Sequence, residues 1–132
     1  LKRISPNPLM EPPRAGEAQR RRSLVEYVAA LKRVAELDIR EAYPGHGENI
    51  TEARALIAER LAFHEARLER VASLLNGQTR TPYAVMRDLF PRLSDGEVFL
   101  GLSEVVGHLD VLEERGQVEE VHHEGVLCYR RC

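Results

Sequence analysis

Residues 43–47 read Tyr43-Pro44-Gly45-His46-Gly47, and the interpretation of the whole chain starts from this stretch. It ends a short β-prone run, residues 39–43, so the sequence predicts a strand followed by a tight turn. The glycines on either side of His46 permit backbone angles and close approaches that a side chain would forbid. A turn at the end of a strand can present an imidazole to a metal ion, which makes His46 the candidate metal ligand. The alternative is a solvated loop histidine, because one histidine alone holds no metal strongly.

Residues 1–22, which precede the first predicted helix, are expected to form a loop. Their prolines, together with Gly16, exclude regular helix. A basic run closes the segment: Arg20, Arg21 and Arg22. We interpret the run as a solvated entry to the helix, with a phosphate-contacting patch as the alternative.

A first amphipathic helix is predicted over residues 23–37. Ser23 and Glu26 have the spacing of a capping box, which favours a helix start at this point. Apolar residues then recur at steps of four, three and four along one face. This apolar stripe consists of Leu24, Val28, Leu31 and Ala35.

A second, longer helix is predicted from the candidate N-cap Thr51 to about Leu75, where Asn76-Gly77 supplies a stop signal. Its apolar stripe consists of Ile57, Leu61, His64, Leu68, Val71 and Leu75. Since His64 lies on the apolar side, we interpret it as a histidine at the edge of the core with a hydrogen-bond partner, in preference to a metal ligand.

A second group of elements is predicted from Gln78 onward. The predicted elements are a helix over 81–90, a helix over 94–115, and strands over 117–123 and 126–131. Thr81-Pro82 supplies an N-cap and a proline at the first helical position, and Ser94 with Glu97 forms a capping box. Glu124-Gly125 between the two β-prone runs indicates a hairpin. With the end of the preceding helix, this order of three helices and a hairpin is that of a winged helix.

Composition limits the class of protein. The chain has 132 residues, 43% hydrophobic and 30% charged, with a formal net charge of −2. These values fit a soluble folded protein without a global basic field. We expect a cytoplasmic location and no membrane association, because neither a long apolar run nor a signal peptide is present. Because the sequence opens with Leu1, we expect it to be part of a longer chain.

The two cysteines are expected to be reduced thiols. Cys128 and Cys132 lie four residues apart on one predicted strand, a separation of roughly 13 Å. A disulfide needs Cα atoms within about 7 Å of each other. A lone pair of this spacing is also a poor zinc site.

Charge argues against groove-reading DNA recognition by the predicted winged helix. Residues 80–132 carry six arginines and ten acidic residues, a net charge of −4. The polar positions of the helix predicted over 94–115 include Glu97, Glu104, Asp110, Glu113 and Glu114. On a DNA-docked helix these carboxylates would face phosphates and oppose binding. We interpret the remaining histidines of this region as solvated: His108, His122 and His123.

Taken in this order, the segments resemble the metallo-β-lactamase superfamily, most of all its glyoxalase-II-like and RNA-processing hydrolases that end in a β-lactamase-associated winged helix. The matching segments are residues 4–9, 24–37, 43–47, 55–67, 80–83 and 97–112. The resemblance implies an α+β chain, mostly α. Residues 1–50 would be the C-terminal remnant of an αββα sandwich, and 51–132 a long connecting helix and a winged-helix domain.

The resemblance also implies a function. Relatives of this kind are metal-dependent hydrolases with two metal ions, usually zinc, whose activated water attacks an ester, thioester, lactone or phosphodiester. The substrate would be a small molecule or RNA. Only the final histidine of the family's ligand set maps onto this chain, as His46, and no catalytic or further cofactor-binding residue is carried over. The HxHxDH ligand loop of the family does not occur in these residues, so we expect the chain alone to bind no zinc tightly and to be inactive.

Two other classes of function remain open: a non-catalytic winged-helix binding or adaptor module, and a purely structural dimerisation domain. In the resembled family the helix over 23–37 packs on a sheet that these residues do not encode. We therefore expect its apolar stripe to be exposed unless a second copy or a preceding part of a longer protein covers it.

Overall fold

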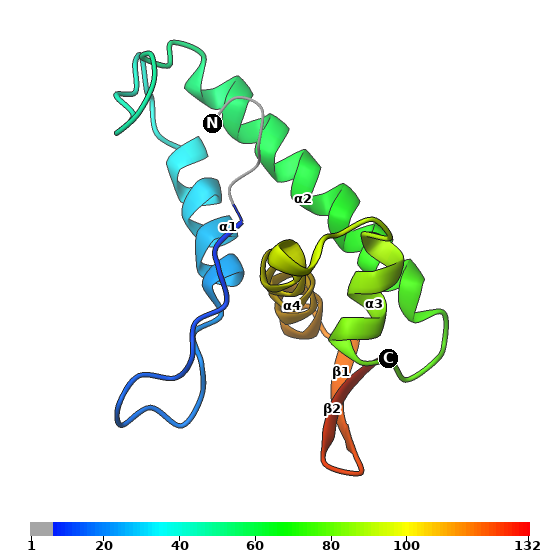
Figure 1. Cartoon of the computed structure of the whole chain (residues 1–132). Helices are drawn as coiled ribbons and strands as arrows, with labels where there is room; N and C mark the ends of the chain where they lie inside the picture. Colours follow the sequence, from blue (N-terminus) through cyan, green and yellow to red (C-terminus); the bar gives the residue numbers. More distant parts are fainter. Residues whose placement is uncertain (1–6) are drawn as a thin grey trace.

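A computed structural model describes residues 7–132 and shows an α+β chain rich in helix (Figure 1). The elements in chain order are α1 (Ser23–Ala35), α2 (Ala53–Leu75), α3 (Pro82–Leu89), a 3₁₀ turn (Asp95–Glu97), α4 (Val98–Glu114), β1 (Val118–His123) and β2 (Val126–Arg131). Residues 1–6, including the start of the predicted loop and of the family resemblance, lie outside the described part. Within 7–132 no helix is both long and apolar enough to cross a membrane.

Several predicted helix ends are confirmed. Thr81 caps α3 by accepting a hydrogen bond from the Ala84 N–H at 3.1 Å. The capping box of Ser94 and Glu97 is complete, although it opens a 3₁₀ turn before α4 begins. α2 ends at Leu75, and its C-cap is Asn76, whose left-handed φ of 47° is one that asparagine adopts more readily than most residues.

α1 begins at Ser23 as predicted, but the predicted N-caps of α1 and α2 are wrong by one residue. Ser23 is the first residue of α1, and the N-cap is Arg22. Glu26 does not close a capping box, because its carboxylate pairs with the guanidinium of Arg21, a charge-assisted partner. Likewise the N-cap of α2 is Glu52 rather than Thr51.

The hairpin forms as predicted. β1 and β2 pair antiparallel, with His123 opposite Val126. The two turn residues, Glu124 and Gly125, both have positive φ, 50° and 79°, the conformation that matches the twist of a two-residue hairpin. Both thiols are free, that of Cys128 buried and that of Cys132 exposed.

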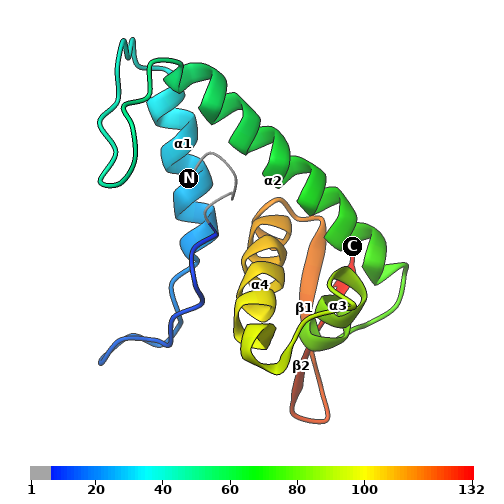
Figure 2. The same ribbon diagram turned by 45° about the horizontal axis from the view of Figure 1, so that its top comes forward.

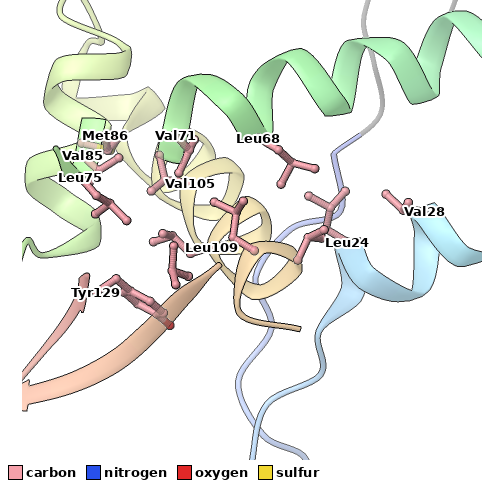
Figure 3. Packing of buried hydrophobic residues seen from close by; sticks show 13 residues of the cluster. Leu24, Val28, Leu68, Val71, Leu75, Val85, Met86, Val105, Leu109 and Tyr129 are labelled. Carbon is pink, nitrogen blue, oxygen red and sulfur yellow. The ribbon is translucent and has the colours of Figure 1, made fainter. Parts of the chain in front are cut away.

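The core is organised around α4, which lies among α1, α2, α3 and the hairpin (Figures 1 and 2). Figure 3 shows side chains from all of these elements meeting on it. The buried apolar cluster consists of Leu24, Val28, Leu68, Val71, Leu75, Val85, Met86, Val105, Leu109, Val111, Leu112, Val118 and Tyr129. α4 approaches α1 closely, because a Cβ at Gly107 would lie only 3.1 Å from the Cβ of Leu24.

The expectation of an exposed stripe on the first helix is wrong for most of that helix. Leu24 and Val28 are buried in the common core, and Leu31 and Ala35 are half-buried. The reason is that α2 and α4 of the same chain both pack on α1. Self-association stays a prediction, now without this premise.

Candidate metal-ligand loop

The strand predicted over 39–43 does not form. Only Ala42 pairs, in an isolated antiparallel bridge to Ile50. The bridge has both backbone hydrogen bonds, Ala42 N–H to Ile50 C=O at 2.8 Å and the reverse at 2.9 Å. A strand needs a neighbour along its length, and within residues 7–132 this one pair is all that the segment finds.

The bridge closes a loop over residues 43–49 that contains His46. Beside the bridge, the carboxylate of Glu41 accepts hydrogen bonds from the Tyr43 hydroxyl and from Nδ2 of Asn49, both at 2.9 Å. Gly47 has φ of 88°, so one flanking glycine is required by the backbone. No described residue makes a close approach to these glycines, since a Cβ at Gly45 or Gly47 would meet none of their atoms within 4 Å.

His46 is exposed on this loop. The segment 36–52 lies at the end of the molecule opposite the hairpin in both views (Figures 1 and 2). A groove of about 310 Å³ begins at the loop and continues along the start of α2. It is lined by Asn49, Ile50, Thr51, Glu52, Ala55, Leu56 and Glu59.

The described residues do not complete a metal site by themselves. An imidazole is a good zinc ligand, but a catalytic zinc is usually held by three protein ligands. Within residues 7–132 no group of three or more His, Cys, Asp and Glu side chains is placed to hold a metal ion. Among the described residues, the loop 43–49 therefore offers His46 as its imidazole donor without the further ligands of a complete site.

The predictions for His64 and for His108 have different outcomes. His64 is 1% exposed on the core side of α2, as predicted, and its Nδ1 lies 3.2 Å from Nε2 of His108. His108 was expected to be solvated, and this is wrong because it is fully buried. α2 covers the face of α4 that the sequence pattern marks as polar.

The hydrogen bonds assign the protons of this pair. Nδ1 of His108 lies 2.7 Å from the Glu104 carbonyl oxygen, which can only accept, so Nδ1 donates. In a neutral ring Nε2 of His108 is then an acceptor, and Nδ1 of His64 donates to it. Burial lowers the pKa of His108 to about 4 and also lowers the pKa of His64, to which the nearby charges of Arg60 and Arg67 contribute. Both rings are thus held neutral as part of the core.

Three of the acidic residues at the polar positions of the helix predicted over 94–115 pair with arginines of the same chain. Asp110 is 2% exposed and binds the guanidinium of Arg20 through both oxygens, at 2.6 and 2.7 Å. Glu113 and Glu104 pair with Arg22 and Arg67. Two arginines of the basic run, Arg20 and Arg22, therefore bind α4, whereas Arg21 is exposed and pairs with Glu26.

The hairpin histidines are exposed, as predicted. Nε2 of His122 lies 3.0 Å from a carboxylate oxygen of Glu120 on the same strand. Their alternating positions on β1 point them to opposite faces, so they do not form a chelating pair.

Known proteins share this arrangement. The chain is 42% identical over 113 residues to the probable metallo-hydrolase YqjP of Bacillus subtilis (strain 168), which covers 86% of this chain and 35% of that protein. The crystal structure of metallo-β-lactamase family protein TTHA1429 from Thermus thermophilus matches with a TM-score of 0.74 and 32% identity, over 100% of this chain and 39% of that one. A β-lactamase domain protein from Burkholderia ambifaria matches with a TM-score of 0.74 and 27% identity, over 85% and 34%. No family model matches the chain.

The fold and these relatives define the class: the chain is similar to a C-terminal segment of larger proteins with the metallo-β-lactamase fold. More particularly, it is a homologue of a protein that is described as a probable metallo-hydrolase. The chain spans about a third of the length of the curated relative, 35%.

Proposed function

We propose that this chain is the C-terminal part of a metal-dependent hydrolase, and that His46 supplies one ligand to a zinc ion whose other ligands lie outside the chain. The observation that carries the proposal is an exposed imidazole on a bridge-closed loop, in a chain homologous to a probable metallo-hydrolase. A bound zinc would lower the pKa of a water molecule to about 7 and polarise the bond to be hydrolysed. The substrate is an ester, thioester or phosphodiester, of a small molecule or of RNA.

In this proposal the chain's own residues present the ligand. The Ala42–Ile50 bridge and the contacts of Glu41 hold the base of the loop, and Gly47 provides the turn. The groove along the start of α2 opens beside the same loop, where part of a substrate could rest. The chain alone is expected to be inactive, because its described residues supply one imidazole where about three ligands are needed.

The C-terminal module is proposed to be a winged helix, comprising the end of α2, α3, α4 and the β1–β2 hairpin. Support comes from the predicted order of elements, which the structure reproduces. We place the domain boundary near residue 50, with 1–50 in the hydrolase body and 51–132 forming the connecting helix and the winged helix. The expected location is cytoplasmic.

The test uses the longer protein that contains this chain. His46→Ala should lower its zinc affinity by roughly tenfold or more, with a matching loss of hydrolysis of generic ester and phosphodiester substrates. Zinc content after dialysis against a graded chelator series measures the affinity. His122→Ala, an exposed histidine of the hairpin, is the matched control and should leave zinc content unchanged. Equal zinc retention by His46→Ala and the control would overturn the proposal.

A second candidate is a non-catalytic binding or adaptor module. It is favoured by three exposed apolar side chains on α3 and the start of α4, Tyr83, Phe99 and Leu100, which are 53%, 50% and 53% exposed. This candidate predicts a chain whose longer form binds no metal but captures a protein through that surface. Loss of capture in Phe99→Ser with unchanged zinc content would support it.

A further inference from the structure

The segment before α1 lies against α4 although it has no helix or strand of its own. We call residues 7–22 the strap. At its start the Met10 N–H donates to the Ser103 hydroxyl of α4 at 3.2 Å, across 93 positions of sequence. The strap then leads through its basic run into α1, whose Leu24 packs on Gly107 of α4.

Arg20 makes the strongest of these contacts. Its two terminal nitrogens lie 2.7 and 2.6 Å from the two carboxylate oxygens of Asp110. Paired donors and acceptors of this kind fix direction as well as distance. Because the Asp110 side chain is only 2% exposed, removing its partner would leave a buried carboxylate uncompensated. The hydrogen bond to Asp110 also raises the pKa of Arg20 above its ordinary value.

Arg22 repeats the contact further along α4. Its guanidinium lies 2.5 Å from the Glu113 carboxylate, at side-chain exposures of 39% and 23%. The α4 partners of the strap and of Leu24 are Ser103, Gly107, Asp110 and Glu113. Their spacing of four, three and three residues puts them on one face of the helix. The strap and the start of α1 therefore lie along a single face of α4.

We propose that Arg20 and Arg22 are positioning residues. By pairing with Asp110 and Glu113 they set the angle at which α1 is held on α4, and α1 in turn sets the position of the metal-ligand loop. Because α1 and α2 hold the two ends of the loop, the angles of these helices set where the loop lies. The importance of this positioning for catalysis rests on the proposed function, whereas the positioning of α1 on α4 does not. The same contacts cover a face of α4, which then cannot enter a DNA groove on that side.

The primary test removes the two charges while keeping shape. In the full 132-residue chain, Asp110→Asn with Glu113→Gln should speed amide exchange across residues 7–35 by at least about tenfold. Peptides from the C-terminal half of α2 should exchange as before. The control is Glu119→Gln, which removes an exposed ion pair to Arg130 on the hairpin, at 48% and 53% exposure. It should change neither region.

A distance measurement separates positioning from mere stability. Spin labels at Glu48→Cys in the loop and His123→Cys on the hairpin, with Cys128→Ala and Cys132→Ser, report the placement of one region on the other. We expect a narrow distance distribution that broadens in the double variant while circular dichroism shows retained helix. The swap Arg22→Glu with Glu113→Arg should narrow it again relative to Glu113→Gln. If the double variant unfolds, Glu113→Gln and the swap carry the same comparison.

An unchanged distance distribution in folded Asp110→Asn, Glu113→Gln chain would overturn the inference, and so would a swap that behaves like Glu113→Gln. These experiments need no metal and no substrate. Their failure therefore leaves the role of His46 untouched, and a failed zinc test leaves the positioning result standing.

Discussion

The metal-ligand loop and helix α4 are built in opposite ways. α4 has ten buried residues among its seventeen and touches every other helix and the hairpin. The loop 43–49 has mostly exposed residues and is held at its base by one bridge and by Glu41. The difference shows that the residues that stabilise the fold are not the residues that present the candidate ligand. The other elements pack on α4 to form the buried core, while the loop takes its place from the helices at its two ends.

The largest effect should come from the centre of the module. Leu109→Ala empties a fully buried position on α4 and should lower the free energy of unfolding by about 2–5 kcal/mol. Urea denaturation measures this as a shift of the midpoint at constant slope. Leu100→Ala on the same helix removes a side chain that is 53% exposed and should cost about 0.5 kcal/mol or less. Similar losses for both variants would contradict the central role of this face of α4.

Acid should weaken the module through its buried histidine pair. The pKa of His108 is lowered from 6.5 to about 4 in the folded chain, so the unfolded state binds more protons between these values. Stability is then fully present above pH 6.5 and falls as the pH drops toward 4, by on the order of 3 kcal/mol. Unfolding midpoints from pH 7.5 to 4 measure the slope.

The groups that face the pair come from three helices: Tyr27 of α1, Arg60, Glu65 and Arg67 of α2, and Glu104 of α4. Arg67 and Arg60 disfavour a proton on the rings, and Glu65 favours one on His64. His108→Gln should flatten the slope between pH 6.5 and 4, whereas His122→Gln should keep it. An equally steep slope in His108→Gln would assign the acid sensitivity to other groups.

The smallest effect should be in the loop. Glu41→Gln weakens the hydrogen bonds from Tyr43 and Asn49 and should speed amide exchange at Ala42 and Ile50 several-fold. The free energy of global unfolding should change by less than about 0.5 kcal/mol, since the residue is exposed. A large shift in the unfolding midpoint would show that the loop belongs to the cooperative core after all.

Local signals in the sequence predicted local structure well. The cap at Thr81, the box of Ser94 and Glu97, and the turn at Glu124-Gly125 were all found where expected. Each involves groups within a few residues of one another, whose geometry depends on the local chain alone. The predicted capping box of Ser23 and Glu26 is the exception, because Arg21 competes for Glu26 and no spacing rule includes that competitor.

Predictions that depended on which faces are covered were less successful. His64 was correctly assigned to the core from its place on the stripe, whereas His108 was assigned to solvent from an equally clear pattern. α4 is covered on nearly all sides. The polar positions of its sequence pattern therefore do not mark a face that is exposed to solvent. The strand at 39–43 failed for the complementary reason, because a β-prone run becomes a strand only beside a partner.

The sequence by itself determined the helices, the hairpin and the resemblance to metallo-β-lactamase-fold proteins, and it supplied the residue that is proposed to bind metal. It did so because capping, turn formation and motif recognition act over short stretches of chain. Only the tertiary structure decided that Arg20 and Arg22 bind α4, about 90 residues away, and that two histidines share a buried hydrogen bond. Such contacts depend on how helices pack in space, and the spacing of residues along the chain does not indicate which distant residues will meet.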